Sequence, residues 1–353
     1  MDLGAHTLTI TLNDLLPNSG NGLGGTGFLF GAGTSFEAGY PMVAMLTRTV
    51  IGALGPTERE AMDEALAASG ATYDDATATP NIEAVADLVM AHAINSGQSR
   101  FASLEERLRL LVTEAILAVT NPTLDHHVRF LTLLKQRAFG QAACVYILTT
   151  NYDVLFELAG AQAGVVVETG FIGSVERYFD HQRFSTSCGA MQPQSRFAEH
   201  PVLTVRLIKL HGSISWIARD GRVFERHPAS ISAGEKRVMI LPRRRKVMDT
   251  LQPPYDTLFA ITSRALGVEC KYLASCGFSF GDEHINQNLL VPAVSNGKVR
   301  LFALCAEETE GMGGMKEAGA FSAGFNAGGI TSGTPHAEGT NCWKFSNFVD
   351  LFG

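Results

Sequence analysis

The chain has little charge, no long apolar run and no signature of a secreted protein. Charged residues make up 18% of its 353 residues, and 35 acidic side chains outnumber 28 basic ones for a net charge of −7. This balance argues against a polyanion such as nucleic acid as the main partner. No run approaches the roughly 20 apolar residues of a membrane-spanning helix, and the first residues lack a basic segment followed by an apolar core. We therefore expect a cytoplasmic protein with no membrane partner and no direct nucleic-acid binding.

The six cysteines contain no Cys-x-x-Cys pair, which excludes the usual spacing of a zinc ribbon. Several of them lie in apolar runs, where a free cysteine acts as a small buried hydrophobic residue. This pattern is typical of reduced thiols in a reducing compartment. The adjacent His126 and His127 do not change this expectation, because neighbouring residues of a helix do not face the same way. We expect no metal site.

What the chain does have is enough apolar sequence, 46% of its residues, to bury a large core. Its length favours two domains, or one domain with an insertion. Apolar strand-like runs alternate with helical stretches on either side of a long Ala-, Leu- and Glu-rich region, which predicts an α/β fold with a Rossmann-like, doubly wound parallel sheet. We expect this domain to comprise residues 1–41 and 141–310. A helical module would be inserted at 42–140, followed by a flexible Gly/Ala-rich segment and a C-terminal docking tail at 311–353.

Periodicity and turn residues predict the individual elements. The expected strands are 8–12, 28–30, 144–148, 165–168, 203–210, 271–277 and 299–304, with short strands beginning at 223 and 238. The expected helices are 58–68, 82–94, 104–119, 124–138, 154–162, 255–266 and 285–294. Residues 170–201 are polar and irregular, and they are interpreted as a lid, a partner surface or a small subdomain.

Three of the predicted strands end in residues that carry chemistry. The first ends in the turn Gly31-Ala-Gly-Thr-Ser35, the second in Asn151-Tyr-Asp153, and the third in His211. In an open parallel sheet, ligands bind at the carboxyl ends of the strands, so these three ends should meet. Glycines let the backbone approach a pyrophosphate, whose oxygens backbone N–H groups and the Ser35 hydroxyl can satisfy. The alternative interpretation is a tight turn between a strand and a helix that binds no ligand.

The polar residues of the other two strand ends suit the cleavage of an N-glycosidic bond. Asn151 can orient a water or a ribose hydroxyl, Asp153 can accept from an amide, and His211 can remove a proton near neutral pH. The transition state is oxocarbenium-like, so a base and oriented oxygens are more useful than a strong nucleophile. Each residue also has a structural interpretation: Asn151 or Asp153 can cap the following helix, and His211 can be a turn residue.

Other features allow two interpretations each. Gly22-Leu-Gly-Gly-Thr-Gly27 matches Gly-x-Gly-x-x-Gly, but a strand follows it where a helix is required, which favours a flexible loop. Glu37 is either a second carboxylate of the site or a residue that favours a helix N-terminus. Trp216 either keeps the site beside His211 dry or packs in the core. The basic run 243–246 is interpreted as a solvated face, with an acidic partner or a cofactor phosphate as alternatives.

Four motifs resemble those of the sirtuin superfamily. The segment from Gly31 to Pro41 is similar to its first glycine motif, and Thr150-Asn-Tyr-Asp153 to its Gln-Asn-Ile-Asp motif. Leu210-His-Gly212 resembles the motif with the catalytic histidine, and Gly277-Phe-Ser-Phe-Gly-Asp282 the late segment that contacts the cofactor. The chain departs from sirtuin deacylases in two ways. It has Met42-Val-Ala44 where they have Asp-Phe-Arg, and it has no four-cysteine ribbon. Its variants resemble instead the bacterial anti-phage branch, and its compact length resembles the subunit that pairs with a HerA-type hexameric ATPase.

The resemblance implies an NAD hydrolase that releases nicotinamide and ADP-ribose with water as acceptor, gated by homo-oligomerisation or by the ATPase. It implies that Asn151 orients water and ribose, Asp153 holds the carboxamide and His211 acts as the base. The residues that it places at the cofactor are Gly31, Ala32, Gly33, Thr34, Ser35, Gly277, Ser279, Asp282 and, near the adenine, Cys305. The alternatives are a module that senses NAD or ADP-ribose without turnover, and an NAD-dependent protein deacylase.

Overall fold

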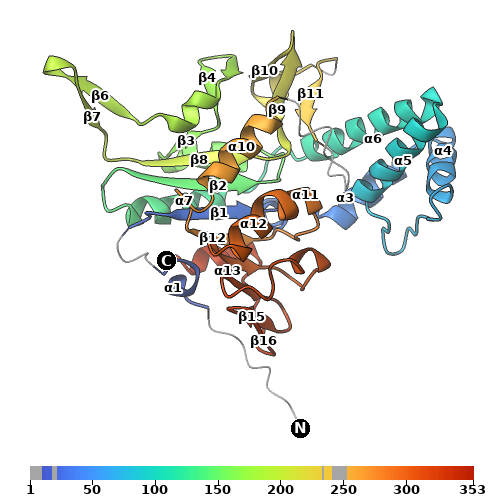
Figure 1. The fold of residues 1–353 in the computed structure, drawn as a ribbon. Helices are drawn as coiled ribbons and strands as arrows, with labels where there is room; N and C mark the ends of the chain where they lie inside the picture. Colours follow the sequence, from blue (N-terminus) through green and yellow to red (C-terminus); the bar gives the residue numbers. More distant parts are fainter. Residues whose placement is uncertain (1–9, 18–21, 233, 241–252) are drawn as a thin grey trace.

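The structure is a computed structural model, and it describes residues 10–17, 22–232, 234–240 and 253–353. Within these residues a nine-stranded sheet has the order β16-β15-β14-β13-β12-β1-β2-β8-β3 (Figure 1). The strands from β14 to β3 pair in parallel, and β15 and β16 add an antiparallel edge. The bounds are β1 Thr26–Phe30, β2 Ala143–Thr149, β3 Val166–Glu168, β8 Leu203–Lys209, β12 Tyr272–Cys276, β13 Arg300–Leu304, β14 Phe321–Gly324, β15 Gly329–Thr331 and β16 Thr334–His336.

The order of the strands reverses between β1 and β12. From β1 the chain builds β2, β8 and β3 on one side, and it then returns through β12 to build β13 and β14 on the other. In open α/β sheets such a reversal opens a crevice at the carboxyl ends of the two strands, which is where ligands bind. The expected doubly wound parallel sheet is confirmed, and it places the glycine turn after β1 at this crevice.

Helices cover both faces of the sheet, because successive strand residues point to opposite sides. Phe28 and Phe30 of β1 pack with helices on one face, whereas Leu29 packs on the other. The first face carries α1 Leu12–Leu15, α7 Asp125–Arg137, α8 Leu155–Ala163 and α13 Phe345–Asp350. The second carries α10 Tyr255–Ala265, α11 Glu283–Ile285, a π-helical turn Asn286–Leu290 and α12 Val291–Ser295.

An aromatic cluster packs against the face of β1 that carries Phe28 and Phe30. Phe28 and Phe30 are fully buried and contact rings from α7, α8 and the C-terminal segment, namely Phe130, Phe156, Phe345, Phe348 and Phe352. Each buried Phe contributes roughly 1.5–3 kcal/mol. Glu37 adds a polar tie, since its carboxylate accepts from the backbone N–H and the hydroxyl of Ser346 in the first turn of α13, both at 2.7 Å. Glu37 is the C-cap residue of α2 Gly33–Phe36, and the helix N-terminus that it contacts is that of the distant α13, which its position in the sequence did not indicate.

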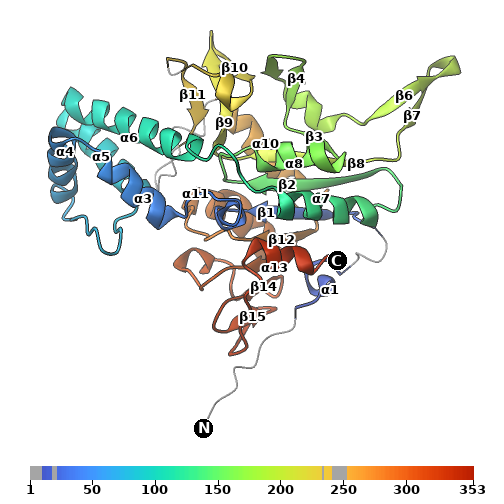
Figure 2. The same cartoon turned by 180° about the vertical axis from the view of Figure 1, so that it is seen from behind.

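A separate helical module follows the glycine turn and its short helix α2 Gly33–Phe36. It comprises α3 Val43–Gly52, α4 Pro56–Ala67, α5 Ile82–Ser96 and α6 Ser99–Leu117, which share a hydrophobic cluster of their own. The module projects from one side of the sheet in both views (Figures 1 and 2). It stays in contact with the rest of the chain through Leu155, Ile214 and Met239, which belong to its cluster. Helix α7 lies within the predicted module 42–140, but it packs on the sheet.

Further strands lie beyond the edge of the main sheet. β4 Phe171–Gly173, β5 Arg177–Phe179, β9 Gly212–Arg219, β10 Arg222–Glu225 and β11 Arg237–Met239 form a second sheet, and β6 Gly189–Gln192 pairs with β7 Arg196–Glu199. The β6–β7 hairpin projects away from the molecule on the side opposite the helical module (Figures 1 and 2). The segment predicted as irregular, 170–201, therefore contains four short strands, whose three or four residues are too few to give a clear periodicity.

Two other expectations differ from the structure. The strand predicted at 8–12 begins outside the described residues, and from Leu12 the chain is helical, because Thr11 and Asp14 form a reciprocal capping box. The segment predicted as flexible contains β14, β15 and β16, which extend the sheet beyond β13. The domain boundaries themselves stay a prediction. Within the described residues, no helix has the combined length and apolar character needed to cross a bilayer.

Candidate functional site

The strand ends predicted to carry chemistry meet at one cavity of about 530 Å³, a volume that falls within the usual range for ligand pockets. Asn151, Asp153 and His211 line it together with the glycine turn after β1. The loop after β12 contributes Gly277, Ser279 and Asp282. Thr34 and Cys305 are not among the lining residues. The Thr34 hydroxyl donates to the Gly31 carbonyl within the turn, and the Cys305 thiol donates to the carbonyl of Phe278 at 3.1 Å.

The glycine turn and the loop after β12 touch backbone to backbone. Gly33 N–H donates to the Gly277 carbonyl at 3.0 Å, and a Cβ placed on Gly33 would lie 2.6 Å from the Gly277 Cα. Gly277 has a φ of +64°, and a Cβ there would lie 2.7 Å from the Gly33 Cα. Since real Cβ contacts are not this short, only glycine allows the two loops to cross. The crossing brings the carboxyl ends of β1 and β12 to the same wall of the cavity.

Three N–H groups of the glycine turn already have partners within the protein. Gly33 donates to Gly277, Thr34 donates to the Gly31 carbonyl at 3.0 Å, and Ser35 donates to the Ala32 carbonyl at 3.1 Å. The sequence predicts that these groups receive a pyrophosphate, whereas here they hold the turn closed. What the turn offers to the cavity is its glycine backbone, which admits a close approach because it has no side chains.

Asn151 and Asp153 bind the glycine turn through their side chains. The Asn151 amide nitrogen lies 3.0 Å from the Gly31 carbonyl oxygen and 2.8 Å from the Ser35 hydroxyl oxygen. The Ser35 hydroxyl in turn donates to Asp153 Oδ2 at 2.7 Å. Asp153 Oδ1 accepts from the Leu155 N–H at 3.1 Å, at the start of α8. Asp153 therefore caps its helix and also belongs to the cavity wall, so its structural and functional interpretations are compatible.

His211 lies against a carboxylate from the opposite loop. Its Nε2 is 2.6 Å from Asp282 Oδ2, and both side chains are buried. Asp282 Oδ1 accepts from the backbone N–H groups of His284 and Ile285 at 3.1 and 3.3 Å, which caps α11. The sequence assigned Asp282 to the cofactor through its motif, and it gave no sign that this carboxylate would contact His211.

A buried lysine, which the sequence reasoning missed, supports the Asn151–Asp153 segment. Lys209 is 2% exposed, and its ammonium donates to the Asp153 backbone carbonyl, to Glu157 Oε1 at 2.8 Å and to the Ser213 hydroxyl at 2.9 Å. A buried ammonium needs such partners, because desolvation is costly for an unpaired charge. The signal that could have revealed it is a charge at the last position of β8, directly before the apolar Leu210 and His211.

The wall of the cavity opposite the sheet comes from the helical module. It includes Leu46 of α3, the segment 79–84 at the start of α5, and Val112 and Ile116 of α6. Tyr40 and Tyr152 complete this side, and burial raises the pKa of both phenols well above their ordinary value, so both stay protonated. The Tyr152 hydroxyl donates to the Ile240 carbonyl at 2.5 Å. The sequence did not predict that the module reaches the site, because nothing in helical periodicity reports which face meets another domain.

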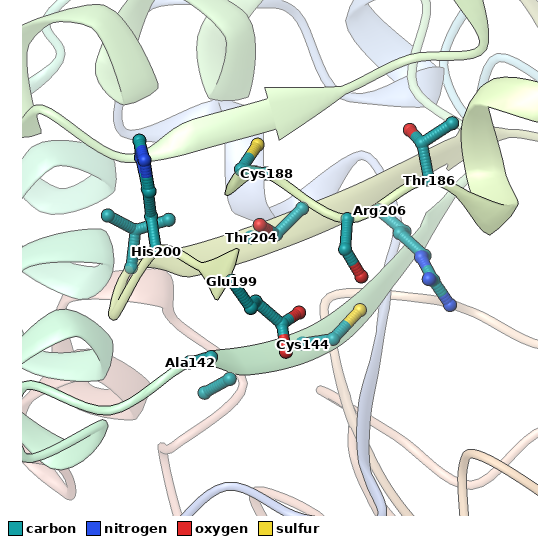
Figure 3. Close-up of a pocket in the computed structure, with 11 residues that line it drawn as sticks. Ala142, Cys144, Thr186, Cys188, Glu199, His200, Thr204 and Arg206 are labelled. Atoms are coloured by element: carbon teal, nitrogen blue, oxygen red, sulfur yellow. The ribbon is translucent and has the colours of Figure 1, made fainter. Parts of the chain in front are cut away.

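The remaining candidates lie elsewhere. Trp216 packs against Phe171 in the core, with ring centroids 5.1 Å apart, and the Gly22–Gly27 run leads into β1 without lining the cavity. The basic run 243–246 lies outside the described residues. A smaller cavity of about 160 Å³ is found at the amino ends of β2 and β8, lined by residues that include Cys144, Cys188, Glu199 and His200 (Figure 3). In the described residues, no group of three or more His, Cys, Asp or Glu is placed to hold a metal ion.

Comparison with known proteins finds a SIR2-like region in the chain. Residues 145–308, somewhat less than half of the chain, match the family model described as a SIR2-like domain. This match includes Asn151, Asp153, His211 and Asp282, whereas the glycine turn lies outside it. No curated protein matches the chain. A solved structure described as a Sir2 homolog–NAD complex aligns over 98% of this chain and 94% of its own, with 13% identity and a TM-score of 0.46. The fold assignment therefore rests on the sheet topology, and the resemblance on the SIR2-like region.

Proposed function

We propose that this chain is an NAD hydrolase, which cleaves the bond between nicotinamide and ribose and transfers the ADP-ribosyl group to water. The observation that carries the proposal is the convergence of Asn151, Asp153 and His211 on one cavity with the glycine crossing of Gly33 and Gly277. The match of residues 145–308 to a SIR2-like domain supports it, because three of the four sirtuin-like motifs lie within these residues. The glycine backbone admits the close approach of a diphosphate, and Ser279 supplies a hydroxyl group at the wall of the cavity.

The reaction needs few groups. The glycosidic C–N bond breaks, and its electron pair goes to the pyridine nitrogen, giving neutral nicotinamide. Water adds to the ribose carbon and loses one proton, so the products are nicotinamide, ADP-ribose and a proton. A preorganised polar site favours the oxocarbenium-like transition state over the ground state.

Each residue has a role in this proposal. The amide nitrogen of Asn151 is held by the turn, so its oxygen is the atom that orients water or a ribose hydroxyl. Asp153 receives the carboxamide of nicotinamide, and Ser35 holds its carboxylate in place. His211 accepts a proton from the sugar hydroxyl or from water. Gly31, Ala32, Gly33 and Gly277 admit the diphosphate, and Ser279 donates to it. Ser35, whose hydrogen is given to Asp153, accepts from a ribose hydroxyl.

The test is nicotinamide release from NAD, measured by chromatography of the products. Asn151→Ala and His211→Ala should each lower the rate by about 100-fold or more, since each removes a group that acts in the transition state. Asn296→Ala and His181→Ala, at exposed positions outside the cavity, are the matched controls and should retain wild-type rates. Circular dichroism checks that all four proteins fold.

Other outcomes separate the alternatives. If Asn151→Ala and His211→Ala both released nicotinamide at the wild-type rate, the assignment of the catalytic site would be wrong. Calorimetric binding of NAD without any cleavage would favour a sensor of NAD or ADP-ribose, and NAD consumption that depends on an added acyl-lysine peptide would favour a deacylase. A parallel assay with NADP determines the preferred dinucleotide.

We further propose that the chain acts in the cytoplasm as an NAD-depleting effector of anti-phage defence. The motif variants that resemble the anti-phage branch are the support for this step. Unrestrained NAD loss is toxic, so the proposal includes gating by homo-oligomerisation or by a HerA-type ATPase. Light scattering measures the oligomeric state, and copurification with the product of an adjacent ATPase gene tests the partner. A monomer that is fully active without any partner would contradict the gating.

A further inference from the structure

Asp282 uses its two carboxylate oxygens for different purposes. Oδ1 accepts from the N–H groups of His284 and Ile285, and Oδ2 lies 2.6 Å from His211 Nε2. The side chains of His211 and Asp282 are 4% and 6% exposed, so water screens this pair little. Both oxygens therefore have partners within the protein, and the partner of Oδ2 is His211, which also lines the cavity.

The chemistry of the two groups determines where the proton lies between them. An ionised carboxylate only accepts hydrogen bonds, so the close contact of Asp282 Oδ2 with His211 Nε2 at 2.6 Å favours a proton on Nε2. A neutral imidazole carries one N–H, and a proton on Nε2 leaves the lone pair on Nδ1. We propose that Asp282 is a positioning residue that fixes this tautomer, so that His211 accepts a proton at Nδ1. The catalytic consequence rests on the proposed function, whereas the tautomer does not.

The loop that carries Asp282 is held firmly enough for this role. The Asn286 side chain donates to the Phe280 carbonyl at 2.6 Å, and Phe280 is fully buried with a φ of +55°. Gly277, at the start of the same loop, is fixed by its contact with Gly33. The carboxylate is thus supported from the backbone on both sides. A catalytic group gains most when a rigid neighbour sets its orientation and tautomer.

The substitution Asp282→Asn separates the capping role from the role at His211. Asparagine caps helices about as well as aspartate, so the amide oxygen should stay with the N–H groups of α11. The amide NH₂ then faces His211 Nε2 and donates to it. Nε2 becomes the acceptor, and the ring proton moves to Nδ1. This substitution should invert the tautomer of His211 without unfolding the loop. Asp282→Ser also keeps a capping residue, but it removes the contact with the ring and enforces neither tautomer.

The direct experiment is a long-range ¹H–¹⁵N correlation on the unliganded protein labelled with ¹⁵N-histidine, in which His211→Ala identifies the signals. In the wild type, Nε2 should show the shift of a protonated nitrogen and Nδ1 that of an unprotonated one. In Asp282→Asn the two should exchange. A wild-type ring protonated at Nδ1, or at both nitrogens, would overturn the proposal, as would an unchanged tautomer in the variant. This measurement does not depend on any NAD turnover.

The kinetic experiment then tests the consequence. Asp282→Asn should lower kcat for nicotinamide release by about 100-fold or more, with KM changed by less than about threefold, because the group acts through His211. Asp282→Ser should lie between this variant and the wild type. Asp256→Asn, which changes the same charge at the exposed start of α10, is the matched control. An inverted tautomer with unchanged kcat would overturn the positioning role, whereas a wild type without turnover would instead remove the proposed function.

Discussion

His127 is a buried histidine with no hydrogen-bond partner for either ring nitrogen among the described residues. Its ring lies between Phe156 and Phe345, with centroids 4.9 and 4.6 Å away. Burial lowers the pKa of His127 from 6.5 to about 4, because the charged form would lose its hydration. Below pH 6.5 the unfolded chain therefore binds a proton that the folded chain excludes, and stability falls as the pH falls towards 4.

This shift predicts an acid sensitivity that one substitution removes. Between about pH 8 and pH 5 the wild type should lose about 2 kcal/mol more of its unfolding free energy than His127→Phe does. Urea unfolding at the two pH values measures the difference. His126→Phe, at the neighbouring half-buried position, is the control and should retain the wild-type pH dependence. Equal losses in His127→Phe and the wild type would show that His127 is not the source.

At this scale the sequence located the residues at strand ends, but it did not reveal their partners. Asn151, Asp153 and His211 follow apolar runs, so the rule that strand ends converge was sufficient to bring them together. The pairing of His211 with Asp282 depends on how the loop after β8 meets the loop after β12, and no local sequence pattern predicts this contact. Lys209 could have been noticed as a charge at the last position of its strand, although its partners Glu157 and Ser213 could not have been named.

Among the elements, the crossing of the glycine turn and the loop after β12 has a measurable cost. Gly277→Ala adds a Cβ that would lie 2.7 Å from the Gly33 Cα and 2.8 Å from the Thr34 nitrogen, at a φ of +64°. We expect a loss of roughly 2–4 kcal/mol in unfolding free energy, from the backbone conformation and the overlap together. Gly297 has nearly the same φ, +65°, and a Cβ there would have no atom within 4 Å. Gly297→Ala therefore measures the cost of the backbone conformation alone, about 1 kcal/mol. Urea unfolding compares the two variants, and equal losses would contradict a tight crossing.

The elements that periodicity predicted are the long ones. The helices at 58–68, 82–94, 104–119 and 124–138 correspond to α4, α5, α6 and α7, because each buries a stripe at three- and four-residue spacing. The strands β14, β15 and β16 were missed, since they have three or four residues each in a Gly- and Ala-rich segment. β14 pairs with β13, whose edge would otherwise be open, and β15 and β16 follow it in turn. These three strands form because they pair with neighbouring strands, and the local composition does not predict such pairing.

Over the whole molecule, the β6–β7 hairpin should be the least protected part. Its strand residues are almost all exposed, whereas β1 is buried along its whole length between two strands. An isolated two-stranded sheet is only marginally stable in water. Hydrogen exchange at low protein concentration should therefore deuterate 189–199 far faster than 26–30 and 143–149. Equal protection would contradict this, and protection that appears only at high concentration would show that Met191 and Phe197 of the hairpin meet another molecule.

The general architecture followed from the alternation of strands and helices, whereas the shared cavity did not. Residues 42–140, the predicted module, do contain a helical cluster, but their last helix, α7, packs on the main sheet. The α5 and α6 surfaces that close the cavity are short patches on otherwise ordinary amphipathic helices. Which face of an inserted module meets its host is decided by the packing around Leu155, Ile214 and Met239, and these three residues come from distant parts of the chain.

The crossing of Gly33 with Gly277 also determines when the cavity can form during protein synthesis. A ribosome makes the glycine turn, the Asn151–Asp153 segment and His211 long before the loop that carries Gly277 and Asp282. Until that loop emerges, β1 has no β12 beside it, and His211 has no carboxylate to hold its ring. A nascent chain cannot assemble the cavity early. The proposed NAD cleavage would thus be withheld until the loop that carries Gly277 and Asp282 has been translated.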